Sequence, residues 1–209
     1  MDITSFISKK ASPILYATSW EAPSNIALVK YWGKFVEQLP KNPSLSFTLS
    51  NSSTNTNVVF TPNSKSIPDF DFYFHNVQKE DFKPKIAIFL ERIHSYIPWI
   101  ENYHLSIKSE NSFPHSSGIA SSASSMAALS LCLMDLEQQL FPEMTSLYFY
   151  QKASFLARLG SGSASRSIQG PVTIWGTNEI QSTSSDLYAI PFGESLHPVF
   201  KTYQDTILL

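Results

Sequence analysis

Cysteine is almost absent from this chain of 209 residues, which contains one, Cys132. A single thiol cannot form an internal disulfide or a cysteine-rich zinc site, so we expect a protein of a reducing compartment, the cytoplasm. Long apolar runs are also missing, because the longest, around Met126 to Met134, falls far below the roughly 20 residues that span a bilayer. The first residues lack the apolar core of a signal peptide. We therefore expect no membrane partner.

Charge of either sign is sparse, with 15 basic and 17 acidic residues and a formal net charge of -2. This balance provides no basic field for a phosphate backbone, which argues against nucleic-acid binding. Five histidines without HxH or HExxH spacing argue against a zinc site built from side chains. Hydrophobic residues make up 43% of the chain, so disorder is excluded. Any anionic ligand must be bound by a local group of residues.

Hydrophobic periodicity predicts both strands and helices. The alternation of Leu45, Phe47 and Leu49 with Ser and Thr predicts a strand over residues 44–50 with one wet face. Spacings of three and four residues predict an amphipathic helix within residues 82–97. Further strands are predicted near 70–74, 103–108 and 172–175, helices over 119–136 and 145–159, and polar loops at 50–57 and 181–186. Because strands and helices do not alternate regularly, this order predicts an α+β fold.

The segment FPHSSGIASSASS, residues 113–125, leads through a proline turn and a glycine into a serine-rich helix start. A helix N-terminus carries unpaired N–H groups and about +0.5 of an elementary charge, so it suits a phosphate group. Gly118 would allow close approach of the backbone, while Ser121 and Ser122 would offer hydroxyls to phosphate oxygens or Mg²⁺. The alternative is an ordinary helix start whose serines pack against a neighbour.

The segment GSGSASRSIQG, residues 160–170, combines glycines and serines with Arg166 as its only charge. Hydroxyl donors and a planar guanidinium suit a small anionic group with two charges. A flexible surface loop is the alternative interpretation. The segment is not a dinucleotide-binding fingerprint, because Ser165 stands at the third glycine position and a helix precedes it.

The segment APSNIALVKYWGK, residues 22–34, reads as an apolar strand interrupted by polar residues. Lys30 and Lys34 beside Tyr31 could hold an anionic substrate. An edge strand protected by lysines explains the same pattern.

Taken together and in this order, the three segments resemble the diphosphomevalonate decarboxylases of the GHMP kinase superfamily. The resemblance runs from Tyr16 to Leu209, and KYWGK with GSGSASRS is specific within that superfamily. It implies the GHMP kinase N-terminal fold, which is ribosomal protein S5 domain 2-like, with a mixed sheet and helices on one face. It also implies that residues 1–209 form the ATP- and substrate-binding domain, with residues 187–209 leading toward a C-terminal α/β domain.

The resemblance further implies a lyase that uses ATP and Mg²⁺ to phosphorylate the 3-hydroxyl of 5-diphosphomevalonate. Loss of phosphate and CO₂ then gives isopentenyl diphosphate, in the mevalonate pathway of isoprenoid biosynthesis. The implied catalytic residues are Lys30, Arg166 and Ser121, with Ser121 also a ligand of Mg²⁺. The implied substrate-binding residues are Asn25, Tyr31, Lys34, Ser161, Ser163 and Arg166, and the implied ATP-binding residues are Pro114, Ser117, Gly118, Ala120, Ser121 and Ser122.

Two departures from the family pattern limit these expectations. Phe35 and Val36 follow KYWGK, where typical members have a charged pair. No residue matches the aspartate that members carry in their second half to orient the 3-hydroxyl, since Asp186 and Asp205 stand in other contexts. We therefore expect the general base beyond Leu209 and no decarboxylation by this chain alone.

Several alternatives stay open from the sequence. One is a related GHMP kinase that acts on mevalonate or phosphomevalonate, and another is a non-catalytic nucleotide-binding remnant. A homodimer is also left open. Residues 206–209 are expected to begin a further strand.

Overall fold

Seven strands form one sheet in the computed structural model, which describes residues 2–63, 69–114, 118–193 and 196–206. The strand order is β4-β3-β5-β2-β6-β7, and β1, which lies off this path, also pairs with β2. The pairs are antiparallel except for β3 with β5, which makes the sheet mixed. The strands are β1 (Tyr16–Val29), β2 (Ser44–Pro62), β3 (Asp69–Phe74), β4 (Val77–Gln78), β5 (Tyr103–Asn111), β6 (Val172–Trp175) and β7 (Ala189–Pro191).

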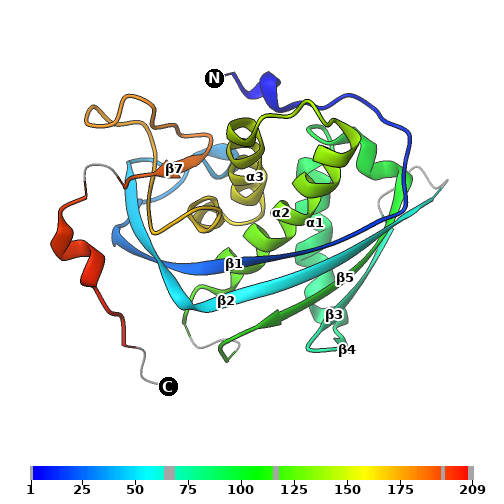
Figure 1. Ribbon diagram of the computed structural model, residues 1–209, viewed down its shortest axis with the longest axis horizontal. Coiled ribbons are helices and arrows are strands. Elements are labelled where there is room, and N and C mark those ends of the chain that lie inside the picture. Colours follow the sequence, from blue (N-terminus) through cyan, green and yellow to red (C-terminus); the bar gives the residue numbers. More distant parts are fainter. Residues whose placement is uncertain (1, 64–68, 115–117, 194–195, 207–209) are drawn as a thin grey trace.

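Three α-helices cover one face of this sheet (Figure 1). They are α1 (Lys83–Ile93), α2 (Ser121–Leu140) and α3 (Ser146–Gly160). The short 3₁₀ helices are η1 (Ile3–Phe6), η2 (Val36–Gln38), η3 (Glu80–Phe82), η4 (Pro98–Asn102), η5 (Gly162–Ser167) and η6 (Pro198–Thr202). The mixed α+β architecture predicted from the sequence is confirmed. In the described part of the chain, no helix has the length and apolar character needed to cross a membrane.

The main core lies between the helices and the sheet. The apolar stripe predicted for α1 is buried there, and α2 is buried along most of its length because small Ala and Ser side chains let it pack closely. The strands contribute alternate residues, as the period of two requires. Central members of this core are Val58, Phe60, Ile86, Phe89, Leu90, Ile93, Leu105, Ile107, Leu131 and Phe155.

The loop predicted at residues 50–57 is wrong, because β2 continues through it. The polar side chains are tolerated in the strand since the inward ones are hydrogen-bonded. The Thr54 hydroxyl lies 2.6 Å from that of Ser124 on α2, and the Thr56 hydroxyl lies 3.0 Å from that of Ser109 on β5. Tertiary hydrogen bonds therefore outweigh the local preference of Ser, Thr and Asn for turns.

The strand predicted at residues 44–50 is confirmed, but its two faces differ from the prediction. Ser44 and Ser46 are buried, whereas Leu45 and Phe47 are half-buried. The reason is that the inward face at this end of β2 meets polar groups of η5 and β6, and the Ser46 hydroxyl lies 3.2 Å from that of Thr173. The serines thus mark a buried polar site and not a wet surface.

A buried ion pair joins α2 and α3. The Lys152 ammonium lies 2.7 Å and 3.0 Å from the two carboxylate oxygens of Glu137, and both side chains are almost fully buried. The Trp99 indole N–H donates to the same carboxylate at 3.0 Å, and Lys152 also donates to the carbonyl of Tyr96 at 3.2 Å. This ion pair is part of the core.

Candidate functional site

Arg166 is a buried cation on η5, with 3% of its surface exposed. One guanidinium nitrogen, Nη1, donates to the hydroxyl of Ser44 on β2. Within the described residues, no carboxylate pairs with this guanidinium and its Nε has no hydrogen-bond partner. Burial lowers the pKa of Arg166 to about 10, which still leaves the group protonated at neutral pH. Arg166 therefore carries a positive charge without a counter-charge in the described part of the chain.

The ring of Tyr31 lies between two cations. The guanidinium carbon of Arg166 and the ammonium of Lys34 are each 5.5 Å from its centroid, at cation–π distance. The Trp175 ring meets Tyr31 edge-on, with centroids 5.0 Å apart. Three of the residues assigned to the substrate by resemblance thus lie together, beside Trp175, to which the resemblance gave no role.

The serines of the glycine-rich segment lie beside this group. Gly162 approaches Lys34 so closely that a Cβ there would lie 3.3 Å from the Lys34 ammonium and 3.2 Å from the Trp175 ring. The hydroxyls of Ser161 and Ser163 are 3.3 Å apart. The segment is a mostly buried 3₁₀ helix, so the flexible-loop interpretation is wrong.

Two consecutive residues of β1 connect this group to the start of α2. The Asn25 amide donates to the carbonyl of Ser163 at 3.1 Å and to the hydroxyl of Ser167 at 2.7 Å. Its neighbour Ser24 donates to the hydroxyl of Ser124 on α2 at 3.4 Å. Because α2 also packs against η5, the two segments predicted to bind anions are neighbours in space.

The start of α2 has an open first turn. Its N-cap residue, Ala120, is in the left-handed region with φ 52°, and its side chain has no oxygen to cap the helix. Gly118 has φ +79°, a value that favours glycine. Ser121 and Ser122 are half-buried and Pro114 is exposed, while Ser117 lies outside the described residues.

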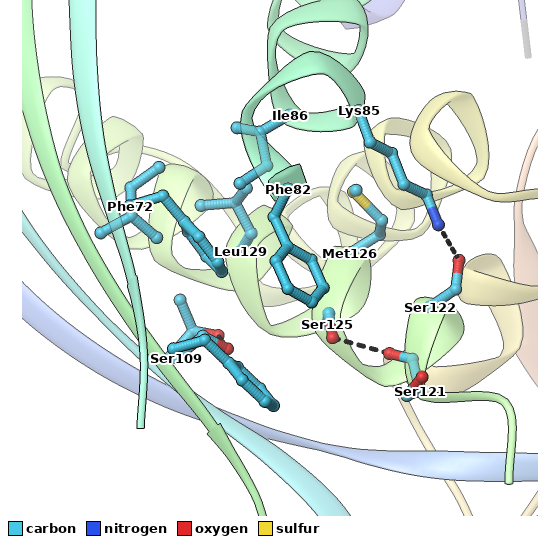
Figure 2. Close-up of a pocket in the computed structure, with 13 residues that line it drawn as sticks. Phe72, Phe82, Lys85, Ile86, Ser109, Ser121, Ser122, Ser125, Met126 and Leu129 are labelled. Atoms are coloured by element: carbon cyan, nitrogen blue, oxygen red, sulfur yellow. Dashed lines mark hydrogen bonds between the residues drawn. The ribbon is translucent and has the colours of Figure 1, made fainter. Parts of the chain in front are cut away.

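A cavity of about 220 Å³ lies beside Ser121 and Ser122. Its walls are largely apolar, with Phe72 and Phe82 prominent among them, and the ammonium of Lys85 donates to the Ser122 hydroxyl at 2.7 Å (Figure 2). Desolvation lowers the pKa of Lys85. An apolar slot that opens toward a cation and a helix N-terminus suits a flat aromatic group attached to phosphates.

Among the described contacts, none joins the Lys30 side chain to Arg166, Tyr31 or Lys34. The side chain of Lys30 is exposed, and its backbone carbonyl accepts from the Asn42 amide at 3.0 Å. Lys30 follows the last residue of β1, which is an edge strand, so the interpretation of a protecting lysine fits it well. Its assignment as a catalytic residue stays a prediction.

The chain is similar to known proteins over most of its length. The family model described as the diphosphomevalonate decarboxylase-like N-terminal domain matches residues 22–186. The chain belongs to this family. The diphosphomevalonate decarboxylase of Gibberella zeae is 37% identical over 183 residues, which cover 81% of this chain and 46% of the relative.

Solved diphosphomevalonate decarboxylases have the same fold. The Staphylococcus aureus enzyme matches with a TM-score of 0.67 and 32% identity, over 87% of this chain and 51% of that one. A structure described as MDDEF in complex with MVAPP, AMPPCP and magnesium matches with a TM-score of 0.65 and 32% identity, over 84% of this chain and 50% of that one. The chain thus spans about half the length of the relatives it matches.

Three residues of this decarboxylase-like domain escaped the sequence analysis. Ser44 stands in a pattern that indicates a wet strand face, Trp175 ends an apolar strand, and Lys85 lies in the first turn of an amphipathic helix. The alternation of Ser with Leu and Phe over residues 44–50 does not reveal that Ser44 is buried. For Lys85, only the fold shows that the start of α1 meets the start of α2.

Proposed function

We propose that this domain binds ATP and 5-diphosphomevalonate side by side, as the N-terminal half of a diphosphomevalonate decarboxylase. The observation that carries the proposal is the buried guanidinium of Arg166, which has no carboxylate partner in the described residues and lies with Tyr31 and Lys34. Buried charges are normally paired, so an anionic ligand is the natural partner for this one. Arg166, Lys34, Ser161 and Ser163 would then hold the diphosphate or carboxylate of the substrate.

The proposal places ATP at the start of α2. The aromatic cavity would hold the base, while the open helix turn, Ser122 and Lys85 would hold phosphate oxygens. Support comes from the related structure described as a complex with AMPPCP and magnesium. Among the described residues, no cluster of His, Cys, Asp or Glu could hold a metal ion. Mg²⁺ would therefore bind through phosphate oxygens and the Ser121 hydroxyl, which fits its usual coordination.

The chemistry explains why two anionic ligands must lie close together. Hydroxide is a poor leaving group, so ATP supplies the phosphoryl group that converts the 3-hydroxyl into a phosphate ester. When phosphate leaves with its bonding electrons, the electron pair of the C–CO₂⁻ bond forms the new double bond and CO₂ is released. The residues of this chain hold and orient both ligands and supply cations near the transferred charge.

Titration calorimetry of the 209-residue chain tests the proposal. We expect binding of AMPPCP with Mg²⁺ and separate binding of 5-diphosphomevalonate, with Arg166→Met removing only the second. Absence of both heats in a folded protein, judged by circular dichroism, would contradict the proposal.

A ligand panel separates the proposal from a mevalonate or phosphomevalonate kinase. If Lys34, Arg166 and the serines of η5 receive a diphosphate, 5-diphosphomevalonate should bind more tightly than mevalonate or 5-phosphomevalonate. Phosphorylated product without CO₂ from either shorter substrate would favour the kinase, whereas binding of AMPPCP with Mg²⁺ but of none of the three mevalonate ligands would favour the nucleotide-binding remnant. In the proposal, the general base lies beyond Leu209, so this chain alone should release no CO₂.

Location and assembly are also part of the proposal. A cytoplasmic location suits a protein whose single cysteine is buried and unpaired. Residues 187–209 would lead toward the second half of the enzyme, and the strand expected at residues 206–209 falls mostly outside the described residues. Sedimentation of the purified chain would test the homodimer.

A further inference from the structure

The turn that carries Lys34 has a strained backbone. Glu37 has φ 58° and the next residue, Gln38, has φ 64°, so two consecutive residues other than glycine are left-handed. Such residues cost backbone energy and persist where surrounding contacts hold them. The turn is closed by a hydrogen bond from the Phe35 amide to the Leu39 carbonyl at 2.8 Å. The side-chain oxygen of Gln38 accepts from the Lys34 ammonium, so the strained residues contact the cation directly.

Arg158 binds this turn through a hydrogen bond to its backbone. It is fully buried near the end of α3, and its Nη1 donates to the carbonyl of Glu37. Its Nε donates to the carbonyl of Leu187, which precedes β7, at 2.8 Å. Its guanidinium carbon lies 5.1 Å from the ring of Phe155. Burial lowers the pKa of Arg158 to about 10, so the group remains charged at neutral pH while it holds two backbone segments.

We infer that Arg158 is a positioning residue that fixes the Glu37–Gln38 turn and thereby places the Lys34 ammonium beside Tyr31 and Gly162. Arg158 acts through Lys34. It donates to the carbonyl of Glu37, and the next residue, Gln38, accepts from the Lys34 ammonium. The role of Lys34 toward a diphosphate rests on the proposed function, whereas the anchoring of the turn does not.

Hydrogen exchange of the turn tests the anchoring without any ligand. Arg158→Lys keeps the charge but loses the guanidinium fork, so we expect about tenfold faster exchange of the amides of Phe35 and Leu39. Arg92→Lys is the control, because Arg92 lines the same cavity as the turn and also donates to a backbone carbonyl, that of Leu159, but has no described hydrogen bond to the turn. Unchanged exchange at Phe35 and Leu39 in Arg158→Lys would overturn the inference.

Substitutions at exposed Glu37 give the same test if Arg158→Lys does not fold. Glu37→Val disfavours the left-handed conformation strongly, so it should move the carbonyl away from Arg158 and speed exchange. Glu37→Gly accepts that conformation without strain and should leave exchange within about twofold of wild type. Equal exchange in the two variants would contradict the role of the strained turn.

A double-mutant cycle with 5-diphosphomevalonate tests the coupling to Lys34. We expect Arg158→Lys to weaken binding about tenfold in the wild-type background and to add almost nothing in a Lys34→Met background. An equal loss in both backgrounds would show a merely structural role and overturn the inference. If wild type binds no 5-diphosphomevalonate but Arg158→Lys still speeds exchange of the turn, the proposed function fails and the anchoring stands.

Discussion

Lys152 and Arg166 are both buried cations, but only Lys152 has a counter-charge in the described structure. Its ammonium contacts both oxygens of Glu137, together with the Tyr96 carbonyl. Arg166 donates to the Ser44 hydroxyl and faces the Tyr31 ring, and no carboxylate of the described residues pairs with it. The difference shows that the fold pairs one buried cation within the core and leaves the other without a carboxylate partner among the described residues.

The surroundings of the two cations explain this difference. Lys152 and Glu137 lie between α2 and α3, where a lone charge would be expensive. Arg166 lies on η5 beside serine hydroxyls and the first residues of β2, where polar groups replace the apolar core. Lys152 and Arg166 therefore differ in their partners and not in their burial.

Removing the paired cation should have the largest effect on folding. Lys152→Met leaves the Glu137 carboxylate buried without a partner, so we expect a loss of about 3–5 kcal/mol in the free energy of unfolding. Urea denaturation measures it. The double variant Lys152→Met with Glu137→Gln should recover much of the loss, and a single variant as stable as wild type would break the comparison.

Removing the unpaired cation, Arg166, should change the free energy of unfolding in the opposite direction. Burial lowers the pKa of Arg166 to about 10, so its protonated form opposes folding at neutral pH by an amount on the order of a few kcal/mol. Arg166→Met should therefore raise the free energy of unfolding, less the lost Ser44 hydrogen bond. As pH rises through about 10, the folded chain loses this proton before the unfolded chain does, so wild type gains stability with pH. The difference in the free energy of unfolding between wild type and Arg166→Met should therefore narrow. Urea denaturation of both proteins at pH 7 and pH 10.5 measures these differences. A loss of unfolding free energy in Arg166→Met as large as that in Lys152→Met would contradict the prediction.

Changing the shape of the unpaired cation should weaken ligand binding alone. Arg166→Lys keeps a charge but cannot give two parallel N–H groups to one oxyanion, so we expect about 100-fold weaker binding of 5-diphosphomevalonate. Calorimetry with AMPPCP and Mg²⁺ is the internal control, since the nucleotide would lie at the start of α2. Near-normal affinity for 5-diphosphomevalonate would refute the assigned role.

Much of the fold follows from local patterns, whereas the buried polar contacts do not. The stripe of Ile86, Phe89 and Ile93 predicts α1 because an amphipathic helix needs only its own spacing. The same reasoning fails for residues 50–57, since Thr54 is stabilised in β2 by Ser124, which is 70 positions away. Periodicity cannot reveal such a partner.

In the candidate site, too, some residues could be predicted from the sequence and others could not. Arg166, Tyr31 and Lys34 could be predicted by resemblance, because the motifs carry them in order. Ser44 and Arg158 could not be assigned, since their roles depend on hydrogen bonds between segments that only the fold brings together.

The hydroxyl contacts near the start of α2 should have a smaller effect than either cation. The Thr54 hydroxyl lies 2.8 Å from the amide oxygen of Asn111 and 2.6 Å from the Ser124 hydroxyl, all on buried side chains. Thr54→Val keeps the shape but leaves both partners without this contact, so we expect a loss of about 1–2 kcal/mol in the free energy of unfolding. Thr54→Ser, which retains the hydroxyl, is the control. If Thr54→Val also weakens AMPPCP binding while Thr54→Ser does not, the hydroxyls hold the first turn of α2 in place for the nucleotide as well as stabilising the sheet.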